Sequence, residues 1–374
     1  MKYIILSFSL FVIAGFPPQA MSWDRHDLLT KFSIEKVKWL EKYTAIEVTP
    51  FESFLSKVFS KTFTEKDFSQ QYQLNPNYKI GFEAPKPAGK KTFPRTGETT
   101  TAKEILSAYS DEPDWGMDND LDISPDQPFM GGTTGPTSRA FRHLYWKGWS
   151  IQAPLRTFHY PPREMGEALK RAQLFYDLAE RAFKVFEPYW AFRFLAWTLH
   201  YIQDLGQPFH ASQLLTPKYV AWEHIFHFKK FVDRTTQIIS NYHWMYERYI
   251  AYRLVQEMEN KAEKTFLPAL EGAHVTHSSS AFLIAKHISD YSNRFSYEIG
   301  EACYLFFGKQ FLDPLVDVPN NPEYFKDISK YDQSSGLSKK EKKLFLEKTE
   351  KNLNKVASFT RSLLELAREE FLLK

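Results

Sequence analysis

Two segments of the chain carry a histidine followed four residues later by a carboxylate, and this spacing could support metal chemistry. The pairs are His200 with Asp204 and His243 with Glu247. Residues at i and i+4 lie on one face of a helix. Taken alone, a pair of this kind is more often a structural ion pair. The segment around His200 is otherwise strongly apolar, however, and a buried carboxylate needs a partner, of which a metal ion is the strongest.

Further side chains offer the same kinds of donor atom. They are His26, Asp111, Asp114, Asp118, His143 and His210. Individually, a histidine is more often part of a core and an acidic run more often a solvated loop. As a set they offer nitrogen and oxygen donors without thiolate, which favours a catalytic zinc site over a structural one. Because the set exceeds what one zinc ion binds, it predicts two or three ions that share a carboxylate.

The segment 199–211 reads Leu-His-Tyr-Ile-Gln-Asp-Leu-Gly-Gln-Pro-Phe-His-Ala. It resembles the signature of the superfamily of zinc-dependent phospholipases C and single-strand-specific nucleases, His-x3-Asp-x5-His with Gln-Pro before the last histidine. The resemblance implies three zinc ions, and Asp114 would also orient or deprotonate the attacking water. The implied ligands are Asp114, His143, His200 and Asp204 for the first ion, His210, His243 and Glu247 for the second, and His26, Asp204 and an N-terminal Trp23 for the third.

The chain departs from this pattern at three places, of which the position of His26, closer to the terminus than usual, is the smallest. The interval from His210 to His243 is longer than in either branch of the superfamily, and so is the interval from Asp114 to His143. The second of these intervals leaves Asp111 and Asp118 as alternatives to Asp114. His224 and His227 lie in the first added segment without a carboxylate four residues on, so we interpret them as surface or core histidines.

Apolar residues recur at helical spacing along most of the chain, which predicts an all-α fold. We expect one multi-helix domain over 23–374, with a zinc cleft between helices and loop insertions near 75–101 and 111–136. These two segments are rich in Pro, Gly and charged residues. The expected helices cover 26–43, 51–59, 164–186, 189–205, 222–256 and 281–312, and a further helix begins near 338.

The N-terminal residues 1–22 have the pattern of a secretory signal, with a short positive start, an apolar run and small residues before a cut after Ser22. We therefore expect a secreted or periplasmic protein whose mature chain begins at Trp23. In the superfamily, such a tryptophan binds zinc through its own amino nitrogen and carbonyl oxygen. Cys303 is the single cysteine, so an intrachain disulfide is impossible, and the core or bound metal must stabilise the exported chain.

Charge and composition limit the partners. With 48 basic and 45 acidic residues and a net charge of +3, the chain lacks the broad basic surface of a duplex-DNA binder. Aromatic residues make up 17% of the chain, and most are expected in the core. The rest could stack nucleobases or contact lipid. No obligate protein partner is expected.

These observations predict a zinc-dependent phosphodiesterase of the phospholipase C type. Zinc-activated water would hydrolyse phospholipid phosphodiester bonds at a phospholipid membrane surface. One alternative is a nuclease for single-stranded DNA or RNA, since both branches of the superfamily share the site. The other is a non-catalytic secreted helical protein with structural zinc.

Overall fold

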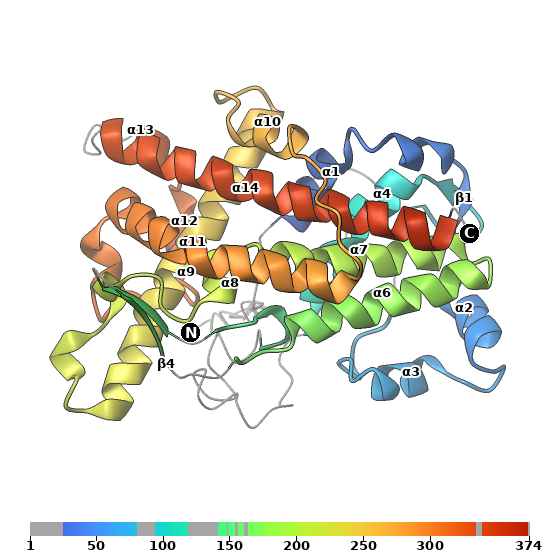
Figure 1. Ribbon diagram of the computed structural model, residues 1–374, viewed down its shortest axis with the longest axis horizontal. Coiled ribbons are helices and arrows are strands. Elements are labelled where there is room, and N and C mark those ends of the chain that lie inside the picture. The colour runs from blue at the N-terminus through green and yellow to red at the C-terminus, as the bar shows by residue number, and fades with distance from the viewer. Residues whose placement is uncertain are drawn as a thin grey trace, which may run out of the picture.

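The computed structural model describes residues 25–80, 94–118, 141–147, 149–153, 156–160, 164–333 and 339–372. Over these residues the protein has an all-α fold, as the sequence predicts (Figure 1). The long helices are α6 (Ala168–Lys184), α7 (Pro188–Leu205), α9 (Phe228–Met258), α11 (Ala281–Phe307) and α14 (Lys339–Ala367). In Figure 1, α14 extends across nearly the whole length of the molecule, beside α11.

Shorter elements complete the described fold. The short α-helices are α1 (His26–Ile34), α2 (Phe51–Val58), α3 (Glu65–Gln71), α4 (Ala102–Tyr109), α8 (Pro208–Ala211), α10 (Phe266–Glu271), α12 (Glu323–Lys326) and α13 (Lys330–Gln333). The 3-10 helices are η1 (Lys38–Lys42), η2 (Glu112–Trp115), η4 (Phe141–His143), η5 (Pro217–Tyr219), η6 (Trp222–His224) and η7 (Lys309–Leu312), and a π-helical turn η8 (Arg368–Leu372) follows α14. Two antiparallel pairs, β1 (Ile46–Glu47) with β2 (Thr99–Thr100) and β3 (Trp149–Ala153) with β4 (Arg156–Tyr160), are the strands described.

Several of the expected helices are shorter than the pattern predicts: α6 covers only Ala168–Lys184 of 164–186, α11 ends at Phe307 rather than 312, and the two largest differences are at α1 and α9. The helix expected over 26–43 ends at Ile34, where Arg361 of α14 donates its Nε–H to the carbonyl of Ser33 at 2.6 Å, and the chain continues as η1. The helix expected over 222–256 begins as the 3-10 turn η6 and is continuous only from Phe228. In both places a tertiary contact or turn interrupts an apolar repeat that is periodic in sequence.

Two short helices begin at capping signals that hydrophobic periodicity does not reveal. Thr64 and Asp67 form a capping box at α3, and Thr101 and Glu104 form another at α4. Both helices lie beside the loop segment expected over 75–101, whose residues 81–93 are outside the described part. The loop expected over 111–136 is described only to Asp118, and there it forms η2 rather than an irregular loop.

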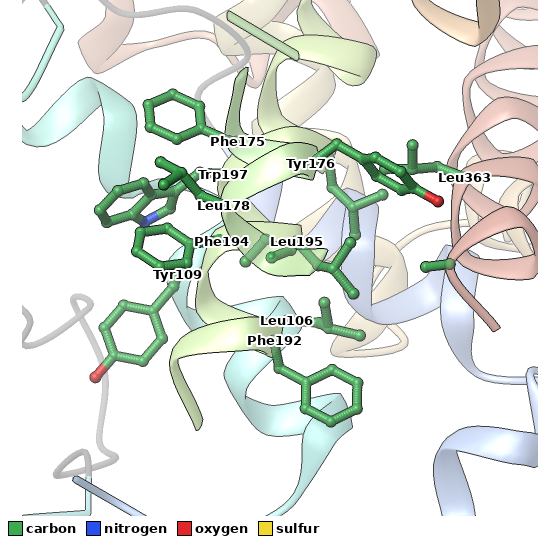
Figure 2. Close-up of a cluster of buried hydrophobic side chains, with 14 of the residues drawn as sticks. Leu106, Tyr109, Phe175, Tyr176, Leu178, Phe192, Phe194, Leu195, Trp197 and Leu363 are labelled. Carbon is green, nitrogen blue, oxygen red and sulfur yellow. The ribbon is translucent and has the colours of Figure 1, made fainter. Parts of the chain in front are cut away.

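Helix α7 forms the centre of the first apolar cluster. All of its residues from Tyr189 to Leu205 are buried, so it packs on every side. Figure 2 shows Leu178 of α6, Leu106 of α4 and Leu363 of α14 packed around it. The Trp197 ring lies 5.0 Å from the Phe175 ring, measured between centroids. Many of the chain's aromatic residues therefore belong to the apolar core in this region.

A second apolar cluster surrounds α9, α10 and the C-terminal half of α11. Its aromatic contacts include Phe306 against Phe345, with ring centroids 4.1 Å apart. Helices α11 and α14 contribute to both clusters. The loop between α7 and α8 passes from the first cluster to the second, and this is where the polar residues of the candidate site gather. Among the described residues, no helix is long and apolar enough to span a bilayer.

Candidate metal centre

The sequence candidates form two neighbouring groups of donor atoms. We call Asp114, His143, His200 and Asp204, together with His26, the inner group. We call His210, His243 and Glu247 the outer group. Three sets within these groups have donor atoms that all lie within 4.8 Å of one another, and they are His26 with Asp114 and His200, His143 with His200 and Asp204, and the whole outer group.

In the inner group, α7 supplies His200 and Asp204 one turn apart, as their spacing predicts. The Nε2 of His200 lies 3.1 Å from Oδ2 of Asp204 and 2.9 Å from Nδ1 of His143. The Oδ1 of Asp114 lies 3.7 Å from the same Nε2. Donor atoms around one tetrahedral zinc ion stand about 3.3 Å apart, since each lies about 2.0–2.1 Å from the metal. The inner group has this spacing.

The outer group joins the short helix α8 to α9. The Nε2 atoms of His210 and His243 lie 3.1 Å apart, and Oε1 of Glu247 lies 2.8 Å from Nε2 of His243. It lies 3.6 Å from Nε2 of His210. These three separations also fit donors that share one ion. His243 is the most accessible of the three, with 17% of its side chain exposed.

Hydrogen bonds orient three of the histidines toward the groups. The Nδ1 of His200 lies 2.8 Å from the Ser110 carbonyl, and Nδ1 of His210 lies 3.1 Å from the His143 carbonyl. The Nδ1 of His26 lies 2.8 Å from Oε1 of Gln203. Because each oxygen accepts the Nδ1 proton, the lone pair of each histidine is on Nε2, which faces the other donors. Metal-binding histidines are commonly oriented in this way.

Burial keeps the outer histidines neutral. Desolvation lowers the pKa of His210 to about 3 and that of His243 to about 3. At neutral pH both rings are therefore uncharged, which is the form that binds metal ions. Two neutral ring nitrogens and a carboxylate oxygen therefore face one another at 2.8–3.6 Å, which is a donor set that a metal cation can bind.

Asp204 lies between the two groups. Its Oδ2 faces His143 at 2.9 Å, whereas its Oδ1 lies 3.4 Å from Nε2 of His26 and 3.5 Å from Nδ1 of His210. This Oδ1 is buried and accepts no hydrogen bond from a described residue. Burial alone would raise the pKa of Asp204, but the neighbouring histidines, His200 foremost, hold it well below the usual range. An ionised carboxylate in this position can bridge two cations.

Element η2 places Asp114, rather than its two alternatives, beside the histidines. Glu112 holds η2 against α7, because its Oε2 accepts a hydrogen bond from Nε of Arg193 at 2.8 Å and another from the indole of Trp197 at 2.5 Å. Asp111 instead accepts the backbone N–H of Asp27 at 3.1 Å.

Asp118 is taken up by a buried ion-pair network and belongs to none of the donor sets among the described residues. Its Oδ1 accepts from Arg142 at 2.8 Å and from Arg171 at 2.6 Å, and its Oδ2 accepts from Nε of Arg171 at 2.6 Å. Burial raises the pKa of Asp118, but the two arginines outweigh burial and hold it below the usual range. Because Arg142 precedes His143, this network fixes the segment that brings His143 to α7. These partners lie far apart along the chain, so no local pattern indicates that they meet.

The turn between α7 and α8 depends on two residues of the recognised motif. A side chain at Gly206 would place its Cβ 2.5 Å from Cγ2 of Val356, so only glycine lets α14 approach this closely. Gln207 accepts the Phe209 N–H at 2.6 Å and donates to Oε1 of Glu247 at 3.1 Å. Gln207 therefore positions both α8 and a donor of the outer group.

The remaining sequence predictions fall in two classes. Trp23 and the proposed signal 1–22 lie outside the described residues. His224 is half-buried at the end of η6 and His227 is exposed just before α9, and neither belongs to the donor sets among the described residues. Gln203 was not predicted to be part of the site. Its position three residues after His200 on a buried helix nevertheless indicated that it lies near the histidines.

The buried His, Asp and Glu groups can therefore hold metal ions. Comparison with protein-family models and with curated proteins finds no match. The function must accordingly be inferred from the residues of the chain itself.

Proposed function

We propose that this protein is an exported zinc-dependent phosphodiesterase of the phospholipase C type and that it belongs to the superfamily its motif resembles. The observation that carries the proposal is the convergence of His26, Asp114, His143, His200, Asp204, His210, His243 and Glu247 on neighbouring, largely buried positions. Nitrogen and oxygen donors without thiolate are typical of catalytic zinc sites.

The proposal includes three zinc ions, the number that the resemblance of the motif implies. The first would be held by Asp114, His143, His200 and Asp204, the second by the outer group, and the third by His26, Asp204 and the Trp23 terminus. Clustered zinc ions supply activated water and neutralise charge on a phosphodiester.

The chain's own residues would position and deprotonate the water. With 12% of its side chain exposed, Asp114 is the most accessible member of the inner group. A carboxylate at the border between buried donors and solvent is suited to orient a water molecule and accept its proton. Asp204 would set the spacing between the ions, and Gln203 and Gln207 would hold His26 and Glu247 in place.

The test combines zinc content with activity. Purified mature protein should contain three zinc ions per chain and hydrolyse phosphatidylcholine vesicles in a chelator-sensitive way. Heat-denatured DNA is assayed in parallel, and preferential cleavage of DNA would move the protein to the nuclease branch. His200→Ala should abolish turnover of bis-p-nitrophenyl phosphate. One zinc per chain, or turnover unaffected by this substitution, would refute the proposal.

Removal of zinc should also destabilise the fold. Donors of the inner group come from α1, η2, η4 and α7, so bound metal joins segments that are distant in sequence. Ligands that bind only the folded state stabilise it by mass action, and we expect the melting temperature to fall by about 5–10 °C on chelation. Differential scanning calorimetry with and without re-added zinc measures this, and an unchanged melting temperature would argue against tight binding.

A further inference from the structure

The segment between the two histidines of the outer group carries an unusual surface. It follows His210 and ends at His243, and it contains η5, η6 and the first half of α9. Midway along it, Phe226 is 95% exposed, Trp222 54% and Ile225 49%. Elsewhere in the described part, the strongly exposed Phe186 and Leu315 stand singly, and the adjacent Phe282 and Leu283 are only 39% and 36% exposed. Three large apolar side chains exposed within five residues indicate a contact surface.

We propose that this segment docks the protein on anionic phospholipid bilayers. We call Trp222, Ile225, Phe226, Lys229 and Lys230 the exposed tip. The inference rests on the proposed function, because it supplies the lipid surface on which that function would act. In Figure 1 the segment projects from the body of the molecule at the lower left, coloured yellow-green to yellow.

The chemistry of the exposed tip matches the interface of a bilayer. The indole Nε1 of Trp222 donates to the Pro217 carbonyl at 3.2 Å, so the polar atom is satisfied within the protein and the ring can enter an apolar layer. Aromatic and aliphatic side chains backed by lysines are typical of segments that lie in the headgroup region. A projecting tip suits a deformable lipid surface better than a preformed protein groove.

The basic side chains near the exposed tip favour binding to anionic lipid. Lys229 and Lys230 are exposed immediately after the apolar residues. Across 217–234 four basic side chains stand against two acidic ones, a net charge of +2. The acidic ones are Glu223 and Asp233, and Lys218 already pairs with Glu301 of α11. Basic residues next to an apolar tip are attracted to negatively charged leaflets.

The exposed tip is coupled to the metal centre by one continuous helix. Helix α9 runs from Phe228 through His243 to Met258. At 1.5 Å per residue, the fifteen residues from Phe228 to His243 span about 22 Å. A docked tip therefore holds the outer group at a fixed, short distance from the lipid surface.

The test measures binding apart from catalysis. The zinc-loaded full chain is sedimented with vesicles of phosphatidylcholine alone and of phosphatidylcholine with phosphatidylglycerol. We expect stronger binding to the anionic vesicles, and weaker binding when salt is raised from about 0.1 to 0.5 M. The triple variant Trp222→Ala, Ile225→Ala, Phe226→Ala should bind at least about tenfold more weakly. Phe186→Ala, which removes an 87% exposed phenylalanine between α6 and α7, is the matched control and should bind as the wild type does.

Several outcomes would overturn the inference. They are absence of wild-type binding to either vesicle, equal binding by the triple variant, and equal binding to both lipid compositions. A wild-type dimer that the triple variant converts to monomer in light scattering would assign the exposed tip to self-association. Hydrolysis of bis-p-nitrophenyl phosphate is followed separately and should be unchanged in the triple variant. Tip-dependent binding without any hydrolysis would leave the docking intact and refute the proposed function instead.

Discussion

The inner and outer groups use the same donor types but are constructed differently. The inner group draws on four segments that are far apart in sequence, and its histidines are fully buried. The outer group needs only α8 and α9, and His243 is partly exposed. The inner group should therefore be part of what holds the fold together, whereas the outer group should be a more accessible site on a fold that stands without it.

The largest effect should come from Asp204, the inner-group carboxylate whose second oxygen lies beside His210 of the outer group. Asp204→Asn replaces a charged bridge by a neutral amide, which is a poor ligand for two cations. We expect phosphodiester hydrolysis to fall by at least about 10³-fold, with metal lost from both groups. Metal analysis and hydrolysis rates measure this. Asp111→Asn is the control and should behave nearly as the wild type, and full metal content in Asp204→Asn would show that the groups are independent.

The next prediction distinguishes a role of Asp118 in folding from a role in metal binding. Asp118→Asn leaves Arg142 and Arg171 buried with a neutral partner. We expect the free energy of unfolding to fall by about 3 kcal/mol, measured by urea denaturation. The control variant Glu347→Gln removes an exposed i, i+4 ion pair with Lys343. It should lower the free energy of unfolding by less than about 0.5 kcal/mol. Folded Asp118→Asn should keep its zinc, and a loss of one ion at unchanged stability would instead make Asp118 a ligand.

Removing one donor of the outer group tests whether this group binds its metal independently of the inner group. His243→Ala should lower activity by about 10²-fold and release only the outer metal, because the inner donors remain in place. Its free energy of unfolding should stay within about 1 kcal/mol of the wild type, as expected for a partly exposed side chain. Loss of every ion in this variant would contradict the separation of the two groups.

The smallest effect concerns the two glutamines, each of which serves one group. Gln207→Leu removes the hydrogen bond to Glu247 and should weaken the outer metal by about tenfold. Gln203→Leu removes the partner of His26 and should weaken an inner metal by a similar factor, about tenfold. Competition with a chromophoric chelator measures both affinities. Identical effects of the two variants on the same ion would show that the groups are not distinguishable.

Local patterns in the sequence were enough for much of the helical fold. The positions of α6 and α7 follow from apolar residues at helical spacing, since that periodicity depends only on neighbouring residues. The pairing of His200 with Asp204 and of His243 with Glu247 was predictable for the same reason. The capping boxes of α3 and α4 are equally local signals, and they are enough to indicate where these helices begin.

The choice among the three aspartates could not be made from sequence. Asp111, Asp114 and Asp118 lie within eight residues and have the same chemistry. The partner of Asp118 is Arg171 on α6, 53 residues away, and η2 is fixed by Arg193 on α7, 81 residues from Glu112. Only packing of α6 and α7 against η2 assigns each carboxylate its neighbour.

The helical class, the donor types and the two i, i+4 pairs follow from the amino-acid sequence, because each depends on residue chemistry or on the geometry of a single helix. Folding was needed to bring the two pairs together, to place Asp204 beside His210 of the outer group, and to leave Trp222, Ile225 and Phe226 exposed. Those outcomes depend on how α7, α8 and α9 pack around a close turn at Gly206, and such contacts between distant segments leave no periodic trace in the chain.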